Sequence, residues 1–278
     1  MHGTRQSGLS TVALALALSV SLGAAAQSLD ERLDDDAFLR GLVDLELRDV
    51  LEHYLRTHPP ADQVQEAEFR IAAERLQVRH AGSDPAARRG TIDRIIELRQ
   101  GLIDGHPDHP RRPIWQIDQA ADLMLEVLRR DASGLTAVFG LPSDVQRERA
   151  ARIAGDADTL LTEAAEGVHR IILELEARPG FRQDETLQEA RRRIAREERD
   201  RRIPFLHGMA TYVRAAVESV RDTQRSRWLE ASARRLASLF DDVDPEVTRR
   251  ARLFSGLALV ELERYDEAAA ALARVGPR

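Results

Sequence analysis

Residues 144–177 read DVQRERAARIAGDADTLLTEAAEGVHRIILELEA, and this stretch decides the fold class. Its small and apolar residues alternate spacings of four and three, which keeps them on one side of an α-helix as a narrow seam against a partner helix. At about 1.5 Å per residue, such a helix is roughly 50 Å long. Because many seam positions are Ala, the partner must approach closely. The seam consists of Ala150, Ala154, Ala157, Leu161, Ala164, Val168, Ile171 and Leu175.

Proline and helix-forming residues divide the rest of the chain into further helices. The eleven Pro residues fall between helical patterns, Ala, Leu, Glu, Arg and Gln fill the intervals, and strand-like alternation is missing. Capping signals mark three helix starts: Asp62 with Gln65, Ser143 with Gln146, and Asp244 before Pro245. The chain is therefore predicted to be all-α. Helices are expected near residues 36–57, 62–79, 91–105, 113–130, 144–177, 184–202, 204–221, 223–240, 245–263 and 266–274.

Composition excludes several kinds of chemistry. The 278 residues carry 41 basic and 47 acidic side chains, for a formal net charge of -6, and all 41 basic residues are Arg. The absence of Lys excludes Schiff-base catalysis and P-loop phosphate binding. The absence of Cys excludes disulfides, thiolate nucleophiles and iron–sulfur clusters. The acidic balance argues against a nucleic-acid partner, because proteins that bind nucleic acid carry a basic face.

The first 26 residues have the pattern of a secretory signal peptide. A short segment with one Arg precedes an apolar run over residues 9–22, and three Ala at 24–26 form a small-residue cleavage site before Gln27. The alternative, an uncleaved membrane anchor, needs about 20 apolar residues, and this run is shorter. No later stretch is apolar enough to span a bilayer. We therefore expect an exported protein, periplasmic or in the cell envelope, without a stable membrane span after cleavage.

Two His-Pro turns indicate an internal repeat. His58-Pro59 and His106-Pro107 lie 48 residues apart, and an apolar helix precedes each of them. Small and apolar positions after the two turns also match, so each unit reads helix, His-Pro turn, helix. A fixed period of this length is typical of helical arrays, because one hairpin cannot bury its apolar face alone.

Residues 251–275, ARLFSGLALVELERYDEAAAALARV, resemble a tetratricopeptide repeat (TPR). The first helix has small residues where the second helix of such a repeat packs closely on it. The turn and the apolar anchor of the second helix follow at the distances that the family pattern has. The matching residues are Gly256, Ala258, Leu259, Tyr265, Ala268 and Leu272. The copy is divergent, because Arg252 stands at the family's aromatic position and Ser255 at its Leu.

The resemblance implies a fold and a role. It implies a TPR-like α-solenoid, a right-handed superhelix of stacked antiparallel helix pairs, that binds a protein or peptide on its concave face. Gly208 and Ala210 repeat the Gly-x-Ala spacing 48 residues earlier, and residues 44–128 are similar in shape to the longer-helix repeats of exported envelope proteins. In the family the second helix runs on to a closing proline, so the natural protein is expected to continue beyond Arg278.

The resemblance and the signal peptide together suggest an organisation in four parts. The expected parts are a signal peptide over 1–26, TPR-like repeats over 27–130, a central helical region with the long helix over 131–243, and an incomplete C-terminal TPR unit over 244–278.

Two clusters contain residue types that bind metals, and both have a simpler interpretation. Glu166 and His169 share one helix face, but a four-helix di-metal site needs a second Glu-x-x-His, and the sequence has none. His106, Asp108 and His109 lie in the segment HPDHP, whose prolines mark a turn between helices. A solvated helix face and a structural turn are therefore favoured, and a metal-binding bundle at Glu166 and His169 is a minor alternative. We expect no metal and no cofactor.

The tract EARRRIAREERDRR at residues 189–202 is rich in Arg. Opposite charges four residues apart predict a ladder of ion pairs along an exposed helix. The predicted pairs are Glu189–Arg193, Glu197–Arg201 and Glu198–Arg202. Arg191, Arg192 and Arg196 are left as candidates for gripping an acidic partner, because guanidinium binds carboxylates in a bidentate manner.

These observations point to a binding protein rather than an enzyme. The catalytic motifs HExxH, GxSxG and GxGxxG are absent, and Trp115 and Trp228, the only tryptophans, are expected in the core. We predict an exported scaffold or adaptor that binds partner proteins or peptides and has no catalysis of its own. The alternative is the N-terminal helical scaffold of a longer exported cell-envelope enzyme, and the coding sequence beyond Arg278 would separate the two.

Overall fold

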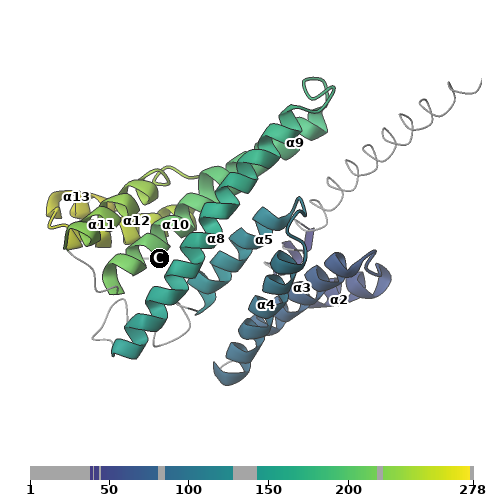
Figure 1. Ribbon diagram of the computed structural model, residues 1–278, viewed down its shortest axis with the longest axis horizontal. Coiled ribbons are helices and arrows are strands. Elements are labelled where there is room, and N and C mark those ends of the chain that lie inside the picture. The colour runs from purple at the N-terminus through teal and green to yellow at the C-terminus, as the bar shows by residue number, and fades with distance from the viewer. Residues whose placement is uncertain are drawn as a thin grey trace, which may run out of the picture. The chain divides into compact units, whose positions relative to one another are not determined.

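The computed structural model describes residues 38, 39, 41–43, 45–80, 85–127, 143–217 and 222–275 (Figure 1). Over these residues every regular element is a helix and no strand occurs, so the predicted all-α class is confirmed. The chain divides into two compact units, residues 1–82 and 83–278. The boundaries at residues 130 and 243 expected from the sequence both lie inside the second unit. The expected signal peptide lies outside the described residues, and none of the described helices is both long and apolar enough to span a membrane.

The first unit is a small helical assembly around one apolar cluster. α2 (Arg48–Thr57) and α3 (Gln63–His80) are joined by the predicted His-Pro turn. The ring of Tyr54 packs against the cluster and stacks on the imidazole of His58, with ring centroids 4.3 Å apart. The cluster consists of Leu39, Leu42, Val43, Leu51, Phe69, Ala72 and Leu76.

The single helix predicted over residues 36–57 is wrong, because the chain turns at residues 45–47 before α2 begins. Glu46 has φ 56°, and the amides of Glu46 and Leu47 donate to carbonyls three and five residues earlier. These are the two hydrogen bonds of a Schellman motif, which ends a helix in the left-handed conformation. α12 (Pro245–Glu261) ends in the same way at Glu263, with φ 60°. Gly usually holds this position, so a Glu there gave no signal of the break.

A long antiparallel helical hairpin runs through the second unit (Figure 1). α8 (Asp144–Glu176) is its first arm and begins with the predicted capping box of Ser143 and Gln146. All eight seam residues of α8 are buried, which confirms the seam. They face two helices rather than one, because α5 (Arg112–Ala121) packs along one side of α8 and α10 (Ile203–Val217) along another.

The second arm of the hairpin is continuous through Pro204. The sequence predicted two helices, 184–202 and 204–221, but α9 (Glu185–Ile194), the π-helical segment η2 (Ala195–Arg202) and α10 follow one another without a break. In a regular α-helix the proline ring clashes with the carbonyl four residues earlier. Here the amide of Ile203 donates to the carbonyl of Glu198, five residues earlier, and this wider turn accommodates the ring.

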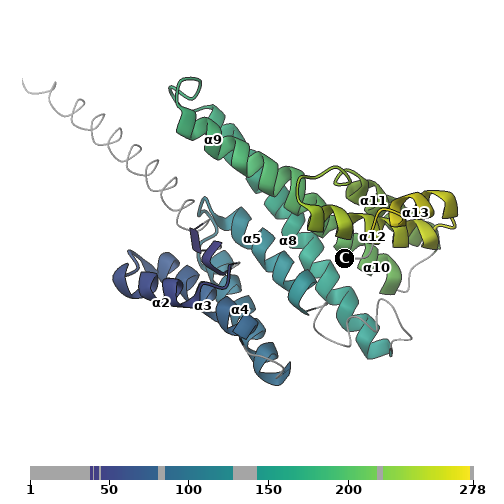
Figure 2. The same cartoon turned by 180° about the vertical axis from the view of Figure 1, so that it is seen from behind.

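The remaining helices complete the second unit. α4 (Pro85–Gly105) begins earlier than predicted, and α5 continues into a second π-helical segment, η1 (Asp122–Val127). After α10, the chain forms α11 (Asp222–Ala237), α12 and α13 (Tyr265–Leu272), each packed against the helix before it (Figure 2). The start of α12 is capped as predicted, because Asp244 accepts hydrogen bonds from the amides of Glu246 and Val247.

Candidate functional site

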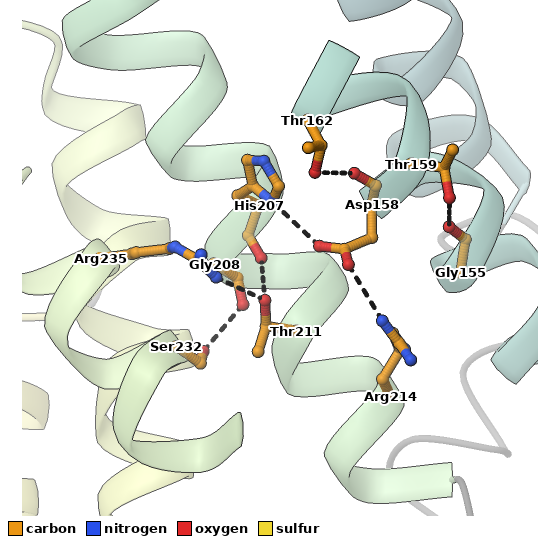
Figure 3. A network of polar contacts seen from close by, with 10 residues as sticks. All are labelled: Gly155, Asp158, Thr159, Thr162, His207, Gly208, Thr211, Arg214, Ser232 and Arg235. Carbon is orange, nitrogen blue, oxygen red and sulfur yellow. Dashed lines mark hydrogen bonds and ion pairs between the residues drawn. The ribbon is translucent and has the colours of Figure 1, made fainter. Parts of the chain in front are cut away.

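A polar network joins α8, α10 and α11 inside the second unit (Figure 3). The carboxylate of Asp158 on α8 is held from two sides: His207 Nδ1 lies 2.9 Å from one oxygen, and Arg214 Nη1 lies 3.0 Å from the other. His207 and Arg214 are seven residues apart on α10, about two helical turns, so both side chains reach α8. The hydrogen bond from His207 lowers the pKa of Asp158, burial opposes this, and the positive charges nearby lower the pKa further.

The network continues from α10 to α11. The buried hydroxyl of Ser232 donates to the carbonyl of Gly208 at 2.8 Å, and Arg235 Nη1 donates to the hydroxyl of Thr211 at 3.0 Å (Figure 3). Gly208 allows this approach because it has no side chain. A Cβ atom there would lie only 2.5 Å from Cγ of Leu236. Helix α11 therefore packs directly on the bare backbone of α10.

An Asp–His pair of this kind orients an imidazole for proton transfer in hydrolases. Over the residues that the structure describes, however, no hydrogen-bond partner contacts the second ring nitrogen of His207. The hydroxyl of Thr211, in the same network, donates to the backbone carbonyl of His207 at 2.7 Å instead. The contacts that the structure does show join the two residues to each other, to Arg214 and to Thr211, and through them the pair ties α8 to α10.

A second polar cluster is formed by residues of α4, α5, η1 and η2. The guanidinium of Arg99 pairs with Asp122 at the start of η1, and both side chains are buried. Arg202 of η2 pairs with Asp118 of α5 and, at 2.9 Å, with Glu198 one turn earlier. π-helical segments often mark functional sites. Here each of these five charges faces an opposite charge, so the cluster joins the helices.

The two clusters of metal-ligating residue types, Glu166 with His169 and the HPDHP segment, lie on an exposed helix face and in a turn between helices. Among the described residues, no group of three or more His, Cys, Asp or Glu side chains is placed to hold a metal ion. Glu166 and His169 are exposed on α8. The ring of His109 stacks on Trp115, with centroids 4.6 Å apart, and its Nδ1 accepts from the amide of Arg111. The HPDHP segment therefore forms a packed turn, and Trp115 is buried as predicted.

The three candidate arginines face carboxylates of their own unit. Arg191 bonds to Glu176 at the end of α8, at 2.8 Å, and so closes the hairpin. Arg192 and Arg196 lie beside Glu189 and Glu197 on their own helix, at 2.9 and 3.9 Å. Contact with an acidic partner would have to compete with these neighbours.

The predicted ladder of ion pairs forms only in part. Glu198–Arg202 is confirmed, but the pair Glu197–Arg201 is wrong, because Arg201 reaches Asp242 at 2.9 Å. Glu197 lies instead 3.9 Å from Arg196, its neighbour in the chain. Glu198 is also buried, so this part of the tract is not an exposed helix.

The TPR-like residues lie on α12 and α13. A Cβ atom on Gly256 would lie 2.6 Å from Cγ of Leu272, so α13 packs directly on the glycine, as α11 packs on Gly208. Ala258, Leu259 and Ala268 are buried, Leu272 is half-buried, and Tyr265 is exposed.

The two residues that depart from the family pattern contact the segment before α12. Arg252 stacks over the ring of Phe240, 4.5 Å from its centroid, and donates to the carbonyl of the same residue. Ser255 donates to the carbonyl of Ala233 at 3.3 Å. These contacts join α12 to the residues that precede it.

Sequence reasoning missed the network around Asp158. A signal was present, because His207 is the only basic residue in the apolar run IPFLHGMATYV at residues 203–213. Its partner lies 49 residues away on another helix and gave no signal. The core position predicted for Trp228 is also wrong: the ring is half-buried beneath Arg214, whose Cζ lies 4.6 Å from the ring centroid.

The chain matches no protein-family model, no curated protein and no solved structure.

Proposed function

We propose that the protein is an exported, TPR-like helical scaffold that binds a protein or peptide and has no catalysis of its own. The observation that carries this proposal is the repeated packing of helix pairs in the second unit. In α10–α11 a leucine of the second helix, Leu236, lies over Gly208 of the first, and in α12–α13 Leu272 lies over Gly256. Stacked helix pairs offer an extended surface, which suits a polypeptide.

The polar networks support the same proposal. The chemically versatile side chains of the second unit, Asp158 and His207 above all, bind one another across helices. A scaffold uses such bonds to hold its helices at fixed positions, which reduces the entropy lost when a partner binds.

Affinity capture with quantitative mass spectrometry tests the scaffold. The tagged chain is expected to enrich a small set of polypeptides, and a purified member of that set should then bind saturably in calorimetry. The double variant Gly208→Leu/Gly256→Leu should lose this binding because it disturbs both helix pairs. The control Gly101→Leu should retain the binding, because no heavy atom lies within 4 Å of a Cβ built at Gly101. The absence of any saturable polypeptide ligand would overturn the proposal.

Export is tested separately by intact-mass measurement. The mature chain recovered outside the inner membrane should begin at Gln27, after the small-residue site. A chain that keeps Met1 and sediments with membranes would contradict export without bearing on the scaffold.

A further inference from the structure

Arg235 on α11 is exposed, and a neutral hydroxyl holds its guanidinium in place. Its Nη1 donates to Oγ1 of Thr211 at 3.0 Å, and over the described residues no carboxylate oxygen lies within ion-pair distance of the guanidinium. Arg191, Arg192 and Arg196 differ, because each of them lies beside a glutamate. Arg235 therefore presents a fixed positive charge at the surface of the second unit.

The polar network around Arg235 has an excess of positive charge (Figure 3). Among the side chains drawn there, Asp158 has the only carboxylate, whereas Arg214 and Arg235 both have guanidinium groups. The pKa of Asp158 is lowered chiefly by the hydrogen bond from His207, and the charge of Arg235 lowers it further, so Arg235 lies near this carboxylate. Because Asp158 binds Arg214 directly, at 3.0 Å, the excess charge belongs to Arg235.

The guanidinium of Arg235 keeps one edge for a ligand. Its hydrogen bond to Thr211 uses Nη1, which leaves Nε and Nη2 side by side on another edge. Two neighbouring nitrogens of this kind form the fork that binds both oxygens of a carboxylate. Since Thr211 already holds the guanidinium, less conformational freedom is lost when a ligand binds.

His207, one turn before Thr211 on α10, adds a group that suits a polypeptide main chain. Its Nδ1 lies 2.9 Å from Asp158, so the neutral ring donates through Nδ1 and accepts through Nε2. No described residue bonds to Nε2, and the side chain keeps 12% of its surface exposed. A main-chain amide can donate to this nitrogen, whereas a small anion such as acetate has no hydrogen to donate.

Arg214 and Trp228 extend the same surface. Trp228 lies two helical turns before Arg235 on α11 and is half-buried, and Cζ of Arg214 lies 4.6 Å from the centroid of its ring. Trp and Arg are the residue types that most often dominate the affinity of protein–protein interfaces. The surroundings of Arg235 therefore suit a polypeptide better than a small anion.

We propose that the Arg235 site, defined as His207, Thr211 and Arg235, binds an acidic side chain of a partner polypeptide. Arg235 binds the carboxylate through Nε and Nη2, and Nε2 of His207 accepts from the main chain of the same segment. The inference rests on the proposed function, since it names the class of segment that the scaffold binds.

Peptide selection on the full purified chain tests the proposal. The probe is a displayed library of random peptides, and the selected peptides should be enriched in Asp or Glu relative to the library. A fluorescent synthetic copy of one selected peptide is then compared with a version in which Gln replaces its acidic residue. The replacement should weaken binding by about tenfold or more, because charge-assisted hydrogen bonds are lost, and added salt should weaken the binding of the acidic peptide.

Two adjacent arginines on α11 provide a matched control. Arg235→Gln should weaken binding of the acidic peptide by about tenfold or more, and Arg235→Lys should retain only part of the affinity, because an ammonium group lacks the planar fork. Arg234→Gln removes the same charge at the neighbouring exposed position and should change the affinity by less than about twofold. Circular dichroism should show the same helix content for all three variants, because both arginines are exposed.

Four results would overturn the inference. They are a selection without enrichment of acidic peptides, equal loss of affinity in Arg235→Gln and Arg234→Gln, inorganic phosphate that binds at Arg235 as tightly as the peptide, and a dimer of the chain that dissociates in Arg235→Gln. If the partner found by affinity capture binds Arg235→Gln as tightly as the parent chain, the scaffold stands and only this site is wrong. If capture finds no partner, the proposed function fails as well.

Discussion

Asp158 is the residue through which α8 and α10 are most directly joined, and its removal has a predictable pH dependence. Asp158→Asn should lower the free energy of unfolding by about 1–3 kcal/mol at neutral pH, because hydrogen bonds to charged groups are lost. The pKa of Asp158 is lowered in the folded state, chiefly by the hydrogen bond from His207. Its stabilisation is therefore complete above the ordinary value of 3.8 and is lost as the pH falls through the lowered folded pKa.

Urea unfolding at several pH values measures this effect. The difference between the parent chain and Asp158→Asn should be largest near neutrality and should shrink as the pH falls below about 4. Asp156→Asn, an exposed neighbour on the same helix, is the control and should change stability little. A difference that grows on acidification would contradict the assigned role.

Gly256 offers a second test at the scale of one residue. Gly256→Ala should lower the free energy of unfolding by about 1–3 kcal/mol, since the new Cβ would lie 2.6 Å from Leu272. Adding Leu272→Ala should cost less in this background than in the parent chain, because it removes the clash. Gly155→Ala in α8, with no heavy atom within 4 Å of the new Cβ, should instead stabilise by about 0.5–1 kcal/mol. Simple additivity of Gly256→Ala and Leu272→Ala in thermal unfolding would show that α13 does not rest on the glycine.

At the scale of one element, the end of α12 is less stable than it could be. Glu263 holds the left-handed position with φ 60°, which costs an ordinary side chain free energy that Gly avoids. Glu263→Gly should therefore stabilise the chain by about 0.5–1 kcal/mol in thermal unfolding. Ala270→Gly, at an exposed position inside α13, should destabilise by about 1 kcal/mol. Loss of stability in both variants would mean that α12 does not end in a Schellman motif.

The π-helical segment η2 depends on its buried charges. Glu198→Gln should lower the free energy of unfolding by about 2–3 kcal/mol, because Arg202 loses one of its two carboxylate partners inside the protein. Glu197, next to it, is half-buried with one long ion contact to Arg196 at 3.9 Å, so Glu197→Gln should change stability by less than about 1 kcal/mol. Equal losses in chemical unfolding would refute a buried role for Glu198.

Helices were easier to predict from this sequence than their interruptions. The seam of α8 and the capping box at Ser143 follow local spacing, and both were predicted correctly. The turn at Glu46 was missed because Gly usually marks a Schellman motif, and here a Glu holds the left-handed position. The continuous helix at Pro204 was missed because Pro usually ends a helix, and here a π-helical turn makes room for its ring. The Asp158–His207 pair joins residues on different helices, and one sequence gives no signal for such a contact.

At the scale of the whole molecule, the division into two units predicts how the chain unfolds. Unit 1 has its own apolar cluster, in which Leu51 is 1% exposed, and Leu161 is completely buried in unit 2. Differential scanning calorimetry should therefore resolve two transitions. The transition of the smaller unit should come at the lower temperature, because a small domain buries a smaller fraction of its surface.

Core substitutions assign the two transitions. Leu51→Ala should lower only the first and Leu161→Ala only the second, each by about 2–5 kcal/mol of unfolding free energy in its own unit. Val243→Ala, at a position that is 80% exposed, should move neither transition. A single transition that both core substitutions shift equally would mean that the units unfold as one cooperative domain. In that case a ligand that binds only unit 1 would raise the shared transition of both units, whereas independent units confine the stabilisation to the first transition.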